Sequence, residues 1–170
     1  MTLKDKQAFR DALSAFPSGV TIVSTTDEDG RHWGFTASAF SSVSMEPPLV
    51  LVCIANTADS HPAFVKAQRY TINILSKGQH DIAMHFAKKG ADKFGGPHAF
   101  RFGTDDAPHP PVLPGSKAAL VCTAHDVYEA GDHTVLIGAL ESVELEDAEP
   151  LLYYNRAFRN MEDLPDAPLP

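Results

Sequence analysis

Short runs that resemble strands recur along this chain, and they are separated mainly by turns. Residues 49–55, LVLVCIA, are apolar at every position, as in a strand at the centre of a sheet. Residues 19–25 alternate and return through a turn at 27–30, which predicts a hairpin. A doubly wound parallel sheet would need a helix after nearly every strand. The pattern therefore favours a mainly β (α+β) fold, with about six antiparallel strands curled into a barrel.

Further strands and short helices complete this expected fold. Residues 4–16 carry apolar side chains at i, i+3, i+4 and i+7, preceded by a capping box of Thr2 and Asp5. Gly138 inside a later strand predicts a bend or bulge. Residues 150–161 are expected to form a strand or turn followed by a short helix. The other expected elements are helices at 60–68 and 80–88, strands at 70–75, 118–130 and 134–146, and a long irregular segment at 93–115, of the kind that is often functional.

Length and charge limit the classes of protein that this chain can belong to. Its 170 residues predict one domain, which we place at residues 1–161, with a flexible C-terminal tail at 162–170. The net charge of −8 argues against a nucleic-acid partner, which would need a basic face. A phosphorylated small molecule remains compatible with this charge, because a few local donors can outweigh a distant negative surface.

Other sequence features point to a cytoplasmic protein that makes no membrane contact. The N-terminal residues alternate charged with apolar positions and lack the apolar stretch of a signal peptide. The longest strongly apolar run has seven residues, far fewer than a membrane span needs. Cys53 and Cys122 both lie in apolar strand-like runs without the spacing of a metal site, so free thiols in a reducing compartment are expected.

The stretch GFTASAFSSVS at residues 34–44 has the composition of a ligand site. Its hydroxyl side chains are short donors, and its alanines let the backbone approach whatever binds there. Such a set suits a phosphate or a flat polar ring. The alternative is a surface hairpin rich in serine and threonine. The hydroxyls belong to Thr36, Ser38, Ser41 and Ser42, and the alanines are Ala37 and Ala39.

Several isolated polar residues have both a functional and a structural interpretation. His133, after Gly131 and Asp132, could orient a substrate or donate a proton near neutral pH, or be a solvated turn residue. Lys88 and Lys89 could bind a phosphate or only solvate a helix end.

Asn56 could face a ligand or form a turn. Arg156 and Arg159 could bind an anion or cover apolar surface with their stems. No metal site is expected, since His80 and His85 are five positions apart and the other histidines are scattered.

Five segments, in this order, are similar to those of one known family. They read FPSGVTIVST, GFTASAFSSVSMEPPLVLVCIAN, YTINILSKGQHDIAMHFA, GDH followed by TVLIG, and PLLYYNRAFR, and they span residues 9 to 159. The chain resembles the flavin reductase-like, FMN-binding split-barrel proteins, which are the small reductase components of two-component flavin-dependent monooxygenases. The resemblance implies a six-stranded antiparallel split barrel, a homodimer, and a flavin bound without a covalent bond.

The resemblance also implies roles for particular residues. His133 would face the nicotinamide, and Arg156 belongs to the C-terminal segment typical of the family. Two positions depart from the pattern: Ser38 stands where many relatives have asparagine, and Phe158 where many have tyrosine. The implied flavin contacts are Thr36, Ala37, Ser38 and Ala39 along the isoalloxazine and ribityl chain, Ser41 and Ser42 close by, Cys53, Ile54, Ala55 and Asn56 at the ring system, and Phe86, Ala87 and Lys88 near the phosphate.

The function implied is that of an NAD(P)H:flavin oxidoreductase, which transfers hydride from NADH or NADPH to FMN or FAD. Reduced flavin would then pass to a separate monooxygenase. Hydride transfer between the two rings needs positioning more than a strong acid or base, which agrees with the lack of a carboxylate pair. Two alternatives share the fold: a flavin store or sensor without reductase activity, and an oxidase or ferric reductase that retains its flavin.

Overall fold

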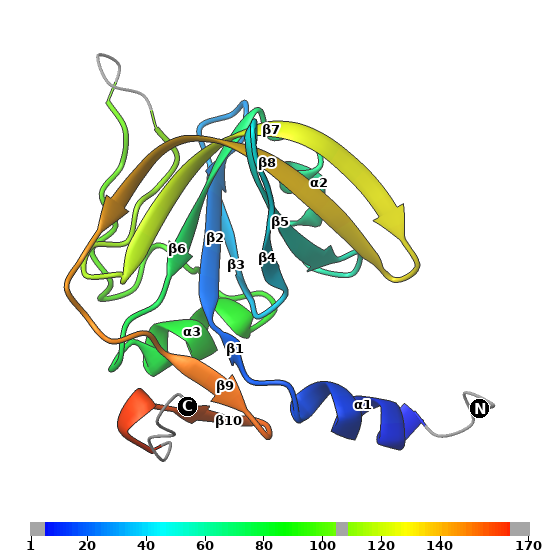
Figure 1. Cartoon of the computed structure of the whole chain (residues 1–170). Coiled ribbons are helices and arrows are strands. Elements are labelled where there is room, and N and C mark those ends of the chain that lie inside the picture. Colours follow the sequence, from blue (N-terminus) through cyan, green and yellow to red (C-terminus); the bar gives the residue numbers. More distant parts are fainter. Residues whose placement is uncertain (1–5, 105–108, 164–170) are drawn as a thin grey trace.

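The computed structural model describes residues 6–104 and 109–163 of the chain, and antiparallel strands make up most of its regular secondary structure (Figure 1). The helices are short and lie outside the strands. In chain order the elements are α1 (Lys6–Ser14), β1 (Ser18–Gly19), β2 (Thr21–Thr26), β3 (His32–Ala37), β4 (Phe40–Met45), β5 (Pro48–Ala55), α2 (His61–Phe64), β6 (Arg69–Ile74), α3 (His80–Ala87), β7 (Ala118–Ala130), β8 (His133–Leu145), β9 (Leu152–Tyr154), β10 (Ala157–Arg159) and the 3₁₀ turn η1 (Met161–Asp163).

The main sheet is curled because its two edges are consecutive in the chain. Its strand order is β3-β2-β6-β7-β8-β5-β4, with every pair antiparallel. Only Ser38 and Ala39 join the edge strands β3 and β4. In a flat sheet of seven strands the edges would be on the order of 29 Å apart, whereas three steps between Cα atoms cover about 11 Å. The sheet therefore bends into the barrel seen in Figure 1.

These observations confirm the mainly β antiparallel fold expected from the sequence. The hairpin of β2 and β3 and the strand at 118–130 are present as expected. The main sheet has seven strands rather than six, because the serine-rich residues 40–45 pair with β5 as a strand of their own. The expected irregularity at Gly138 is present: this residue pairs with Ala124 of β7, where the register shifts.

Three clusters of buried apolar residues form the core of the described chain, and the two larger ones are next to the site. The barrel interior contains Val23, Phe35, Val52, Ile54, Phe64 and Tyr70, among others. The second cluster lies between the sheet and α3, and it includes Ile22, Leu75, Ile82 and Phe86. Figure 1 shows α3 below the barrel, close to β2 and β3. This second cluster places α3, and the residues that follow it, beside the end of β3.

The irregular segment at 93–115 is fastened to the sheet by buried polar side chains. Asn73 of β6 donates from Nδ2 to the carbonyl of Ile22 at 3.0 Å and accepts the backbone N–H of Leu113 at 2.9 Å. Ser24 donates to the carbonyl of Pro111 at 2.5 Å. The polar residues Thr71 and Asn73 of β6 are fully buried because this segment covers them.

Some expected boundaries were wrong. Residues 150–161 form the hairpin of β9 and β10, because Asn155 and Arg156 adopt positive φ values of 48° and 60° in a two-residue turn. The helical part is limited to η1, where Glu162 accepts a hydrogen bond from Lys77 at 2.7 Å. The three helices are shorter than expected. The capping box of Thr2 and Asp5 lies outside the described residues, as does the expected tail beyond residue 163.

The glycine at position 34 is required by the close approach of α3 to β3. A Cβ atom there would lie 2.6 Å from Cε1 of the buried Phe86. We expect Gly34→Ala to lower the free energy of unfolding by about 1–3 kcal/mol, the usual cost of overpacking. Gly19→Ala is the matched control, since nothing lies within 4 Å of a Cβ at that position. Urea denaturation gives the free energy of unfolding of both variants. If the Gly34→Ala variant were as stable as the Gly19→Ala variant, the close contact with Phe86 would not explain the glycine.

Candidate functional site

A pocket of about 320 Å³ lies where β3, β5 and the residues after α3 meet. This volume is at the lower end of the range for small-molecule sites, about 300–1,000 Å³. The pocket brings together most of the residues proposed from the sequence. Its lining consists of Phe35, Thr36, Ala37, Ser38, Ala39, Cys53, Ile54, Ala55, Thr57, Ala58, Asp59, Phe86, Ala87, Lys88, Lys89, Lys93 and His133.

Small side chains line one part of this pocket, and we call Ala37, Ala39, Ala55 and Ala58 its alanine floor. Ala39 lies beside β5 because it extends the pairing of β4 with β5, and the backbone N–H of Cys53 donates to its carbonyl at 3.1 Å. Short side chains let a flat ring approach the backbone closely. The exposed hydroxyl of Ser38 has no hydrogen-bond partner among the described residues.

Thr36 lines the pocket, but its hydroxyl has a structural partner. Its Oγ1 donates to the carbonyl of Ala83 in α3 at 2.6 Å. The hydroxyl proton therefore joins β3 to α3 instead of pointing to a ligand. Sequence alone could not reveal this bond, because the two residues are 47 positions apart.

Three lysines also line the pocket, and they come from a later part of the chain than the alanine floor. Lys88, Lys89 and Lys93 all follow α3, and the only carboxylate in the lining is that of Asp59. Asp59 accepts the backbone N–H of Gly90 at 2.7 Å. Burial lowers the pKa of Lys93, and the charge of Asp59 opposes this shift. An excess of positive charge in a chain of net charge −8 makes this pocket suitable for an anion such as a phosphate.

His133 lies at the pocket, and a network around Asn56 holds its turn. Its Nδ1 is 2.7 Å from Oδ1 of Asp132, and this hydrogen bond lowers the pKa of Asp132. Asn56 donates from its backbone N–H to the carbonyl of Asp132 at 3.0 Å and from Nδ2 to that of Gly131 at 3.3 Å. It also accepts the hydroxyl of Thr134 at 2.9 Å. Asn56 does not line the pocket; it fixes the turn that carries His133.

Three other proposed residues also lie outside the pocket lining. Ser41 and Ser42 are exposed on β4, and Ser41 donates to the carbonyl of Ser42. Arg156 lies in the turn between β9 and β10, where it forms an ion pair with Asp11 of α1. Five lining residues were not among those proposed from the sequence: Phe35, Thr57, Ala58, Asp59 and Lys93. Two of them had a signal, since Phe35 lies in the candidate ligand stretch at 34–44 and Lys93 in the irregular segment expected to be functional.

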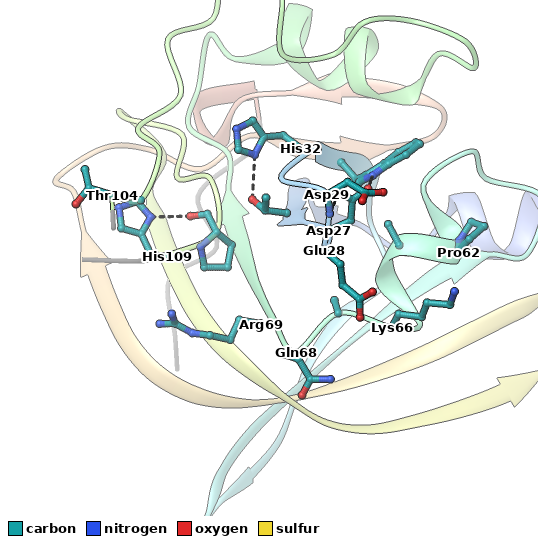
Figure 2. A pocket seen from close by; sticks show the side chains of 16 residues that line it. Asp27, Glu28, Asp29, His32, Pro62, Lys66, Gln68, Arg69, Thr104 and His109 are labelled. Carbon is teal, nitrogen blue, oxygen red and sulfur yellow. Dashed lines mark hydrogen bonds between the residues drawn. The ribbon is translucent and has the colours of Figure 1, made fainter. Parts of the chain in front are cut away.

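A second, larger pocket of about 770 Å³ lies between the β2–β3 turn, α2 and residues near His109 (Figure 2). Two of its charged groups have partners within the protein. Asp27 accepts the indole N–H of Trp33 at 2.6 Å, which lowers the pKa of Asp27. Arg69 forms an ion pair with Glu141 at 2.5 Å. The lining holds three carboxylates, those of Asp27, Glu28 and Asp29, against the cations of Lys66 and Arg69, so the smaller pocket is the better candidate for an anion.

Two further properties concern only the residues that the structure describes. Within them, no group of three or more histidine, cysteine, aspartate or glutamate side chains is arranged to hold a metal ion. None of their helices combines the length and apolar character needed to cross a membrane.

Fold and pocket together define a split-barrel protein. Residues 13–162 match the family model described as "Flavin reductase like domain". The chain belongs to this family.

The chain is also similar to several named proteins. The chain is 44% identical over 155 residues to actinorhodin polyketide dimerase of Streptomyces coelicolor, covering 91% of this chain and 85% of that one. It is 39% identical to the stachydrine N-demethylase reductase subunit of Rhizobium meliloti, covering 88% of this chain but only 63% of that one. Among solved structures, the NADH:FAD oxidoreductase of Streptomyces globisporus, in complex with NAD and FAD fragments, superposes with a TM-score of 0.86 at 32% identity, covering 99% and 98% of the two chains.

The two cysteines should differ in reactivity. Burial raises the pKa of the Cys53 thiol, and it raises the pKa of Cys122, which has no exposed surface, to about 12. Because the thiolate is the reactive form, we expect iodoacetamide at pH 8 to label Cys53 slowly and Cys122 only after unfolding. Mass spectrometry measures both, and Cys53→Ser should abolish labelling of the native protein. Labelling of Cys122 in the native protein would contradict this.

Proposed function

We propose that this chain is an NADH-dependent flavin reductase, and that the pocket of about 320 Å³ holds the flavin. The observation that carries this proposal is that one pocket joins the alanine floor to a cluster of three lysines. A flavin mononucleotide has both a flat ring and a phosphate, and each part of the pocket matches one of them. The family membership of residues 13–162 and the NADH:FAD oxidoreductase of similar fold support the proposal.

Each part of the pocket has a role in this proposal. Ala37, Ala39 and Ala55 give the ring a close, flat contact, and the free hydroxyl of Ser38 donates to it. Lys88 and Lys89 bind the phosphate as point charges. When bound, the flavin supplies a hydride acceptor, and a reduced nicotinamide supplies the hydride. The protein holds the two rings in register and excludes water between them, which is the main task of a protein in such a reaction.

His133 is proposed to orient the nicotinamide. Asp132 holds the imidazole through Nδ1, so Nε2 is left to meet the substrate. The bonds from Asn56 to Gly131 and Asp132 keep this turn in place. His133 therefore orients the nicotinamide, and hydride transfer needs no strong acid or base from this residue.

The flavin is proposed to be FMN or FAD and to leave after reduction. The pocket offers neutral donors and surface lysines rather than an enclosing phosphate loop, which suits a ligand that dissociates. Two relatives are named as the reductase subunit of a flavin-dependent monooxygenase and the reductase component of 4-hydroxyphenylacetate 3-monooxygenase. We therefore propose that a separate monooxygenase receives the reduced flavin from this chain.

Activity and the role of His133 can be tested together. We expect the protein to reduce many equivalents of FMN or FAD with NADH, followed by the loss of NADH absorbance. His133→Ala should raise the KM for NADH about tenfold, the effect of losing an orienting hydrogen bond. His125→Ala is the matched control, because His125 is also exposed and pairs with the next residue, Asp126, at 2.7 Å. Flavin binding without any turnover would instead indicate a flavin store or sensor.

We also propose that the protein is a homodimer and that α1 lies in the interface. This helix has no buried residue, and it lies beside β9 and β10, pointing away from the barrel (Figure 1). On and just after α1, Phe9, Leu13 and Phe16 are 50%, 60% and 76% exposed. Such an unpaired apolar face marks an interaction surface.

The dimer can be tested by sedimentation velocity. We expect Leu13→Asp to convert dimers to monomers, because a carboxylate would be buried without a partner. Met84→Asp is the control, since Met84 is 52% exposed on α3 and away from α1. A wild-type protein that sediments as a monomer at all concentrations would rule out the homodimer.

A further inference from the structure

Three contacts join β3 to α3 and to the segment that follows it. Thr36 donates to the carbonyl of Ala83 at 2.6 Å. Gly34 allows Phe86 to lie against the strand, since a Cβ would be 2.6 Å from its ring. Lys93 then returns to the same place, where Nζ donates to the carbonyl of Gly34 at 2.9 Å. Lys93 therefore connects the segment after α3 directly to the strand that leads into the alanine floor.

The segment at 88–96 has other attachments. The backbone N–H of Gly90 donates to Asp59, and His85 donates from Nε2 to the carbonyl of Asp92 at 3.1 Å, but neither bond reaches β3. Phe94 packs against Phe86 and against His32 at the start of β3, with ring centroids 5.2 and 5.6 Å apart. The bond from Lys93 meets β3 at Gly34, two residues further along the strand toward the alanine floor, so it has the more direct influence on how far Lys88 and Lys89 lie from that floor.

We propose that Lys93 is a positioning residue, which holds Lys88 and Lys89 at the distance from the floor that a phosphorylated flavin requires. This inference rests on the proposed function, and it adds a selectivity: FMN is bound in preference to riboflavin, which lacks the phosphate. Lys93 acts through the other two lysines, because its own ammonium is directed to the carbonyl of Gly34.

The first test measures equilibrium binding without turnover. FMN and riboflavin are titrated separately, and the quenching of flavin fluorescence gives a Kd for each. We expect Lys93→Met to weaken FMN binding about tenfold, the usual effect of losing a charge-assisted contact, and to leave the Kd of riboflavin unchanged. Lys93→Arg, which keeps a donor and a charge, should restore most of the FMN affinity. Lys66→Met, an exposed lysine of the other pocket, should change neither Kd.

The second test asks whether Lys93 acts through its neighbours. In a Lys88→Met, Lys89→Met background, FMN selectivity should already be lost, and adding Lys93→Met should change the Kd little, because residues that act as one unit are not additive. If Lys93→Met still weakened FMN binding tenfold in that background, Lys93 would itself bind the phosphate and the inference would be wrong. Equal weakening of FMN and riboflavin would also overturn it.

Failure of this inference and failure of the proposed function have different signatures. If the wild-type protein bound neither flavin, the proposed function would fail. If it bound and reduced both flavins with equal Kd values, the reductase would stand and the selectivity through Lys93 would be refuted. If Lys93→Met does not fold, Lys93→Gln takes its place with the same expected and contradicting results, and the Lys88→Met, Lys89→Met variant, with both substitutions at exposed positions, shows whether those two lysines carry the selectivity.

Discussion

The short connection between β3 and β4 is the constraint on which the rest of the structure depends. Ser38 and Ala39 join the two edges of a seven-stranded sheet, so the sheet must curl until those edges meet. The same closure brings β3 into contact with β5, and residues of both strands line the pocket. The pocket floor lies at this closure. In this fold the pocket can therefore form only when the barrel closes.

The pocket has a local excess of positive charge, although the chain as a whole is negatively charged. The chain carries a net charge of −8, yet three lysines and one carboxylate line the pocket. Coulomb interactions in salt are screened beyond about 10 Å, so the local groups dominate what a ligand experiences. The lining of the larger pocket near Trp33 has three carboxylates and two cations, so it lacks the excess of positive charge found in the smaller pocket. Volume alone would not distinguish the two pockets in this way.

The sequence predicted the secondary-structure elements better than it predicted which groups each side chain contacts. Apolar periodicity and turn residues predicted the antiparallel barrel, because the apolar positions in residues 49–55 and 118–130 reflect which side chains each strand buries. Motif resemblance correctly grouped Ala37, Cys53, Phe86 and His133 around one pocket. It could not show that Thr36 bonds to Ala83 or that Arg156 pairs with Asp11, because these contacts join residues 47 and 145 positions apart. Lys93 was missed for the same reason.

The two-residue connection between β3 and β4 also determines where the chain can change in length. An inserted residue there would loosen the closure, and a deletion would pull the strands out of register, so variation at this point alters the barrel itself. The described parts of residues 93–115 are attached to the sheet at separate points, one of them the buried bond between Asn73 and the backbone of Leu113. A loop held in this way can lengthen between its attachments at small entropic cost. Diversity among proteins of this architecture should accumulate in that segment and leave the closure unchanged.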